Sequence, residues 1–101
     1  MKEILLVCAA GMSTSLLVNK MKAHAKKIGI DVEIEALSIS EASSKIDTAD
    51  IIMLGPQVRY QKPQIDKAVA GRIPVLVIDM KDYGMMNGKG VLETAFKAME
   101  A

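Results

Sequence analysis

The sequence predicts an α/β fold, in which a single domain over residues 1–101 contains one open four-stranded parallel sheet with helices on both faces. Short apolar runs alternate with stretches of helical periodicity along the whole chain, which is the pattern of successive β–α–β units. The length of 101 residues and the apolar content of 50% suit one compact domain with its own core. No linker, repeat or low-complexity segment interrupts this pattern.

Four segments are expected to form the strands. The first, residues 4–7, is an unbroken apolar run, and the second, residues 31–36, alternates strictly between apolar and acidic residues. Such alternation indicates one solvated face, so the second strand is expected at an edge of the sheet. The third, residues 50–54, is continuously apolar and expected to be buried on both faces, and the fourth follows at residues 75–78. With right-handed crossovers, these features predict the strand order 2-1-3-4.

The first two helices carry recognisable end signals. Helical periodicity begins near Leu16, and Gly29 follows two lysines as the expected C-cap of that helix. Ser38 with Glu41 three residues later is the capping-box pattern of a short second helix.

The last two helices are less sharply bounded. The third is expected to start after Val58 and to be capped by Gly71. The last opens within residues 87–90, and its buried stripe is expected to be Val91, Leu92, Ala95, Phe96 and Met99.

Cys8, the only cysteine, stands at the carboxyl end of the first strand. The seven residues that follow it before the helix are mostly small or hydroxyl-bearing, and because none is proline each keeps its backbone N–H: Ala9, Ala10, Gly11, Met12, Ser13, Thr14 and Ser15. The strand order 2-1-3-4 has its switch point between the first and third strands, where open α/β sheets bind ligands. The turn at residues 55–57 is expected at the same place. A thiolate beside backbone amides and a helix N-terminus suits an anion such as phosphate.

Missing motifs narrow this chemistry. The loop has neither the GxxxxGK[ST] pattern of a nucleotide-phosphate loop nor the GxGxxG pattern of a dinucleotide site. A cysteine phosphatase carries an arginine where this chain has Thr14, and without that guanidinium the transition state for hydrolysis is poorly stabilised. The loop is therefore expected to hold a phosphoryl group on sulfur without passing it quickly to water.

Composition excludes several other classes. A formal net charge of +1 and three aromatic residues give no basic face for nucleic acid. A lone cysteine without a Cys/His cluster predicts no disulfide and no metal site, and no cofactor is expected. The apolar runs are too short to enter a membrane, and no signal-peptide pattern opens the chain, so a cytoplasmic location is expected.

The string CAAGMSTSLLV at residues 8–18, with LGPQ at residues 54–57 and Tyr60, resembles the IIB component of the lactose/cellobiose (N,N'-diacetylchitobiose) family of the bacterial sugar phosphotransferase system. The resemblance extends over essentially the full chain, including Ile78-Asp79 and Tyr83-Gly84. It implies a four-stranded parallel α/β fold and a phosphocysteine at Cys8.

The resemblance also implies partners and roles. A IIA protein would donate a phosphoryl group from its histidine to Cys8, and a β-linked disaccharide bound in the membrane protein IIC would receive it. Residues 9–15 would surround the phosphate, and Gln57 and Tyr60 would be loop or partner contacts by position. A low-molecular-weight-type cysteine phosphatase and a non-catalytic binding or redox module remain as alternatives.

Overall fold

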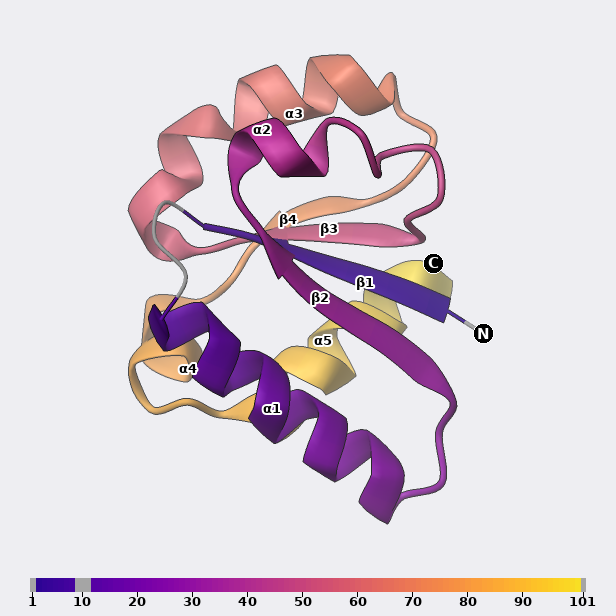
Figure 1. Ribbon diagram of the computed structural model, residues 1–101, viewed down its shortest axis with the longest axis vertical. Helices are drawn as coiled ribbons and strands as arrows, with labels where there is room; N and C mark the ends of the chain where they lie inside the picture. The colour runs from indigo at the N-terminus through magenta and orange to yellow at the C-terminus, as the bar shows by residue number, and fades with distance from the viewer. Residues whose placement is uncertain (1, 9–11, 101) are drawn as a thin grey trace.

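The structure, a computed structural model, describes residues 2–8 and 12–100 (Figure 1). Its strands are β1 (Lys2–Val7), β2 (Val32–Leu37), β3 (Ile51–Leu54) and β4 (Val75–Val77). They form one parallel sheet in the order β2-β1-β3-β4. The predicted fold class and strand order are confirmed.

Helices cover both faces of this sheet (Figure 1). The elements between and after the strands are α1 (Met12–Lys27), α2 (Ile39–Ala42), the 3₁₀ helix η1 (Pro56–Gln61), α3 (Lys62–Val69), α4 (Met80–Gly84) and α5 (Gly88–Glu100). The helices α1, α4 and α5 lie on one side of the sheet, and α2 and α3 lie on the other.

The side chains of β1 alternate between two separate apolar layers. Ile4 and Leu6 join the layer under α1 and α5, whereas Leu5 and Val7 join the layer under α2 and α3. All four side chains are fully buried. Each such burial stabilises the fold by about 1.5–3 kcal/mol, which is why the central strands are unbroken apolar runs.

The polar second strand lies at the edge of the sheet, as predicted. Ile34 points into the core, Glu33 is exposed, and Glu35 is bound by Lys45, whose Nζ lies 3.0 Å from Glu35 Oε1. The predicted capping box of the next helix is also present, with Ser38 as N-cap and Glu41 as its reciprocal partner.

Helix α1 starts four residues before the predicted position, at Met12 instead of Leu16. Ser13, Thr14 and Ser15 therefore belong to its first turn and do not precede the helix. Propensity did not indicate this start because Thr14 is fully buried in a tertiary contact described below. The other end is as predicted, with Lys27 as the last residue and Gly29 at a positive φ of 74°.

The chain after β3 differs from the expectation in three places. A 3₁₀ turn precedes α3, and Ala70 caps α3 in the left-handed conformation (φ 52°), one residue before the predicted Gly71. The short helix α4 was not predicted. In α5 the expected stripe is present, with Val91, Leu92 and Ala95 buried and with Phe96 and Met99 half-buried against the same layer.

Candidate functional site

Cys8 lies directly after β1, between the carboxyl ends of the two neighbouring strands. Its backbone N–H donates to the carbonyl of Leu37 at the end of β2, at 3.0 Å. On the other side, the N–H of Gly55 donates to the carbonyl of Val7 at 2.8 Å. The Cys8 residue is buried, with 5% of its surface exposed. The sheet therefore holds the thiol in a fixed position at its switch point.

The turn after β3 contacts Cys8 closely. A Cβ atom added to Gly55 would lie 3.2 Å from Gln57 Oε1, 3.5 Å from the Val7 carbonyl oxygen and 3.8 Å from Cys8 Cβ. Little space for a side chain exists there, which suits a glycine. The structure thus brings together Cys8 and the 55–57 turn, as expected from the strand order.

The first turn of α1 supplies the second side of the site. Ala9, Ala10 and Gly11 lie outside the described residues, and helix α1 begins directly after them, at Met12. An α-helix leaves its first N–H groups without an acceptor inside the helix, and its dipole favours negative charge there. The predicted phosphate-binding segment therefore includes a helix start, formed by Met12, Ser13, Thr14 and Ser15.

Thr14 has a partner that its place in the sequence does not suggest. It is fully buried, and its Oγ1 lies 3.2 Å from the hydroxyl oxygen of Tyr83 in α4. Tyr83 is itself buried, with 8% of its surface exposed. This hydrogen bond joins the start of α1 to an element 69 residues further along the chain.

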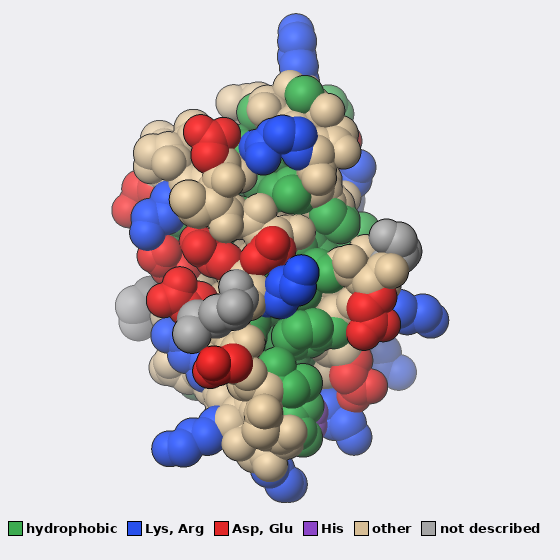
Figure 2. Space-filling model, turned by 90° about the vertical axis from the view of Figure 1, so that its right-hand side faces the viewer, with side chains coloured by type: hydrophobic (Ala, Val, Ile, Leu, Met, Phe, Trp, Pro, Cys, Tyr) green, Lys and Arg blue, Asp and Glu red, His purple; other side chains and the backbone are tan. Residues whose placement is uncertain are grey.

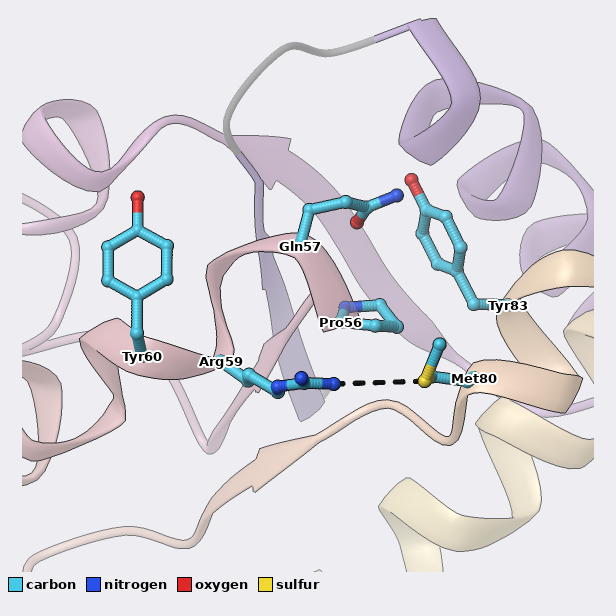
Figure 3. A pocket seen from close by; sticks show the side chains of 6 residues that line it. All are labelled: Pro56, Gln57, Arg59, Tyr60, Met80 and Tyr83. Atoms are coloured by element: carbon cyan, nitrogen blue, oxygen red, sulfur yellow. Dashed lines mark hydrogen bonds between the residues drawn. The ribbon is translucent and has the colours of Figure 1, made fainter.

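A cleft of about 450 Å³ lies beside these residues (Figure 3). Its lining comes from η1 and from α4: Pro56, Gln57, Arg59, Tyr60, Met80 and Tyr83. In Figure 3 the ends of the Gln57 and Tyr83 side chains point toward one another. The predicted contacts Gln57 and Tyr60 therefore line one cleft.

The mouth of the cleft is both apolar and cationic. Tyr60 and Met80 are 72% and 66% exposed. The guanidinium of Arg59 donates to Met80 Sδ at 3.7 Å, and among the described residues no carboxylate lies within ion-pair distance of it (Figure 3). This surface can therefore accept apolar and acidic groups from another molecule.

Sequence reasoning missed the roles of Met80 and Tyr83 because it missed α4. The signal for that helix was Asp79, whose Oδ2 accepts from the N–H groups of Lys81 and Asp82 at 3.1 and 3.2 Å. An aspartate at this spacing is a common N-cap, and it follows the fourth strand directly.

The opposite end of the molecule carries mixed charge. Figure 2 views the side at which β1 starts and α5 ends, and it shows acidic and basic side chains interspersed around a band of hydrophobic ones. Among residues 2–8 and 12–100, none of the helices combines the length and the apolar character that a membrane span needs.

A family model described as the lactose/cellobiose-specific IIB subunit of the PTS, the sugar phosphotransferase system, matches residues 3–94. The chain belongs to this family. It is therefore a phosphotransferase component of sugar uptake, and IIB components of this kind work in the PTS together with IIA and IIC proteins.

Relatives of known name match over nearly their whole length. The oligo-beta-mannoside-specific EIIB component of Bacillus subtilis (strain 168) is 46% identical, over 98% of this chain and 97% of its own. The galactose-specific EIIB component of Lactococcus lactis subsp. cremoris (strain MG1363) is 44% identical, over 97% of this chain and 96% of its own.

Two solved structures are similar to this IIB fold. The cellobiose-specific IIB component of Borrelia burgdorferi has a TM-score of 0.83 at 40% identity, covering 98% of this chain and 92% of that one. The lactose-specific IIB domain of Streptococcus pneumoniae has a TM-score of 0.86 at 17% identity, covering 96% of each chain, and supports the fold alone.

Proposed function

We propose that this IIB component carries a phosphoryl group on Cys8. It receives the group from a phosphohistidine of a IIA protein and transfers it to a β-linked disaccharide of the cellobiose, chitobiose or lactose class during uptake through a membrane IIC protein. The protein acts in the cytoplasm as a single domain, residues 1–101. Relatives named for oligo-beta-mannoside, galactose and cellobiose support a sugar acceptor.

The position of Cys8 is the observation that carries this proposal. The thiol lies at the carboxyl end of β1, hydrogen-bonded into the ends of β2 and β3 through its backbone and that of its neighbour. The first turn of α1 begins four residues later. A nucleophile near the backbone amides and the positive dipole end of a helix start is an arrangement that suits a bound phosphoryl group.

The first transfer is a displacement at phosphorus. The Cys8 thiol gives its proton to solvent and the thiolate attacks, an S–P bond forms as the N–P bond of the donor breaks, and the leaving imidazole keeps the electron pair and takes up a proton from solvent. Phosphoryl groups of this kind pass through loose transition states, so catalysis consists mainly of positioning and charge stabilisation. Residues 9–15 supply backbone amide donors for the phosphoryl oxygens.

The second transfer reverses the role of sulfur. A sugar hydroxyl oxygen attacks the phosphorus, the S–P bond breaks, and the electron pair returns to the Cys8 thiolate while the hydroxyl proton passes to solvent or a base. Both partners therefore approach the same end of the sheet. The cleft at Gln57, Arg59 and Tyr60 lies there and serves as a contact surface for them.

Intact-protein mass tests the proposal. After incubation with phosphoenolpyruvate, the general phosphotransfer proteins and IIA, the wild-type protein should gain one phosphoryl group. Cys8→Ser keeps the size of the side chain but should abolish turnover, because an alcohol is barely ionised at neutral pH. A wild-type protein that gains no mass, or a gain that survives Cys8→Ser, contradicts a phosphocysteine.

The same protein preparation separates the proposal from hydrolysis. A cysteine phosphatase would release phosphate steadily from an aryl phosphate, whereas a carrier should give no turnover above that of Cys8→Ser. The residue at the position of the phosphatase arginine is Thr14, which is buried and hydrogen-bonded to Tyr83. Without a guanidinium there, the loop lacks the charge that hydrolysis requires.

A further inference from the structure

We infer that Tyr83 is a positioning residue for phosphoryl transfer: through its hydroxyl it holds Thr14, and with it the first turn of α1, in place beside Cys8. The inference rests on the proposed phosphocysteine and adds to it a residue that contacts the helix start and not the phosphoryl group.

The contact between the two side chains is specific. Thr14 Oγ1 and the Tyr83 hydroxyl oxygen lie 3.2 Å apart, and both residues are buried. Within the described ranges with assigned burial, Thr14 is the one fully buried polar side chain. A buried hydroxyl that loses its partner carries an uncompensated desolvation cost, so this bond strongly favours one placement of the helix start.

The tyrosine is itself anchored to the sheet. Ile78, directly after β4, donates its N–H to the Leu54 carbonyl at 2.8 Å, and Asp79 follows as the N-cap of α4. Beyond the helix, Asn87 Nδ2 donates back to Oδ1 of Asp82, within α4, at 3.1 Å. Helix α4 is therefore fixed relative to the carboxyl ends of the strands. Because Tyr83 belongs to α4, its hydrogen bond fixes the position of Thr14 relative to those strand ends as well.

This connection matters for transfer because amide donors act through their geometry. Donors fixed at the correct distance before the reaction stabilise the transition state without reorganising, and a displacement of about 1 Å can cost up to a hundredfold in rate. Loss of the Tyr83 hydroxyl should leave the amides in place on average but free to move. The transfer step should then slow while donor binding is little changed.

The test compares hydroxyl-deletion variants with a matched control. Tyr83→Phe keeps the ring, Thr14→Val keeps the side-chain shape, and Thr14→Ser keeps the hydroxyl. Thr94→Val is the control, because the Thr94 hydroxyl likewise makes one hydrogen bond, to the carbonyl of Gly90 at 2.9 Å, but lies on the exposed side of α5. The rate of phosphoryl gain on Cys8 is measured by mass against IIA concentration, and folding is checked by thermal unfolding.

Tyr83→Phe and Thr14→Val should each lower the maximal rate about tenfold with little change in the KM for IIA, as expected for a lost buried hydrogen bond. The double variant should be no slower than either single one, because both remove the same bond. Thr14→Ser and Thr94→Val should stay near the wild-type rate.

Two results separate this inference from the proposed function. If the wild-type protein takes up no phosphoryl group, the proposed function fails and the inference with it. If the wild type is phosphorylated and folded Tyr83→Phe matches its maximal rate, the inference alone is overturned. Additive losses in the double variant would also overturn it, since the two hydroxyls would then act separately.

Discussion

Gly88, at the first residue of α5, lies against the backbone of α1. A Cβ atom there would be 2.6 Å from the carbonyl carbon of Lys20 and 2.7 Å from the backbone nitrogen of Met21. Such distances are closer than van der Waals contact with atoms that cannot rotate away. The lack of a side chain at Gly88 therefore allows α1 and α5 to approach this closely. This packing also bears on the candidate site, because the site includes the first turn of α1.

Gly88→Ala should lower the free energy of unfolding by about 1–3 kcal/mol, because the added methyl group forces the helices apart. Gly84→Ala is the matched control: a Cβ there meets nothing within 4 Å, and the loss of glycine entropy should leave stability unchanged or raise it by about 0.4–1 kcal/mol. Urea unfolding measures both. Equal midpoints for Gly88→Ala and the wild type would show that the helices separate without cost.

At the residue scale, the sequence shows which side chain can act as a nucleophile more readily than it shows which side chains contact each other. Cys8 could be located because a lone thiol after an apolar run is visible in the chain itself. The Thr14–Tyr83 hydrogen bond could not be predicted, because its two residues are 69 positions apart and each also fits an ordinary local role. Side-chain pairs of this kind depend on the final packing, which single-sequence patterns do not encode.

At the scale of the element, α2 is a short helix held by its capping box. Ser38 accepts from the N–H of Glu41, and Glu41 Oε1 accepts from the backbone N–H and the hydroxyl of Ser38 at 3.2 and 2.9 Å. The hydrogen bond from the Ser38 side chain lowers the pKa of Glu41 most, and the one from the Ser38 backbone lowers it further. A lowered pKa in the folded state means that the ionised carboxylate stabilises the fold.

Ser38→Ala should destabilise the protein by about 0.5–2 kcal/mol and raise the pKa of Glu41 toward its ordinary value. The wild-type contribution is present above the ordinary glutamate pKa and is lost as the pH falls through the lowered folded value. The stability difference between variant and wild type should therefore shrink in acid. An NMR titration of Glu41 and urea unfolding at two pH values check this, and an unmoved Glu41 pKa would contradict it.

The ends of the helices show which boundaries local sequence patterns can predict. The capping box at Ser38 and the glycine after α1 are local signals, and both were predicted. The start of α1 and the whole of α4 were not, because the first depends on burial of Thr14 and the second has only five residues. Tertiary contacts thus decide the two helix boundaries that shape the candidate site.

At the scale of the whole molecule, two apolar layers share the central strands. Leu92 of α5 belongs to one layer and Ile65 of α3 to the other, and both are buried. Strands β1 and β3 supply side chains to each layer. Because both layers share these strands, unfolding of the sheet in one layer would expose the side chains of the other. The protein should therefore unfold as one cooperative unit.

Leu92→Ala and Ile65→Ala should each lower the free energy of unfolding by about 2–5 kcal/mol. In both variants, unfolding followed by far-UV circular dichroism and by tyrosine absorbance should give coincident transitions, as in the wild type. Two separated transitions in either variant would instead indicate that the layers unfold independently.

The global arrangement was predictable because few topologies satisfy the pattern. A polar, strictly alternating strand placed second in a parallel sheet indicates an edge, and right-handed crossovers then leave the order 2-1-3-4. That order alone brings Cys8 beside the Gly55 turn. The cleft between η1 and α4 could not be predicted, since it depends on a 3₁₀ turn and on the short helix α4.

The outer strands of the sheet also bear on self-association. An uncovered strand can recruit an identical strand from another chain and begin ordered aggregation. Here β2 presents the exposed carboxylate of Glu33 and the Lys45–Glu35 ion pair, and β4, at the opposite margin, has only three residues. The charges on β2 and the shortness of β4 disfavour strand addition at the two edges, so the native protein should resist fibril formation.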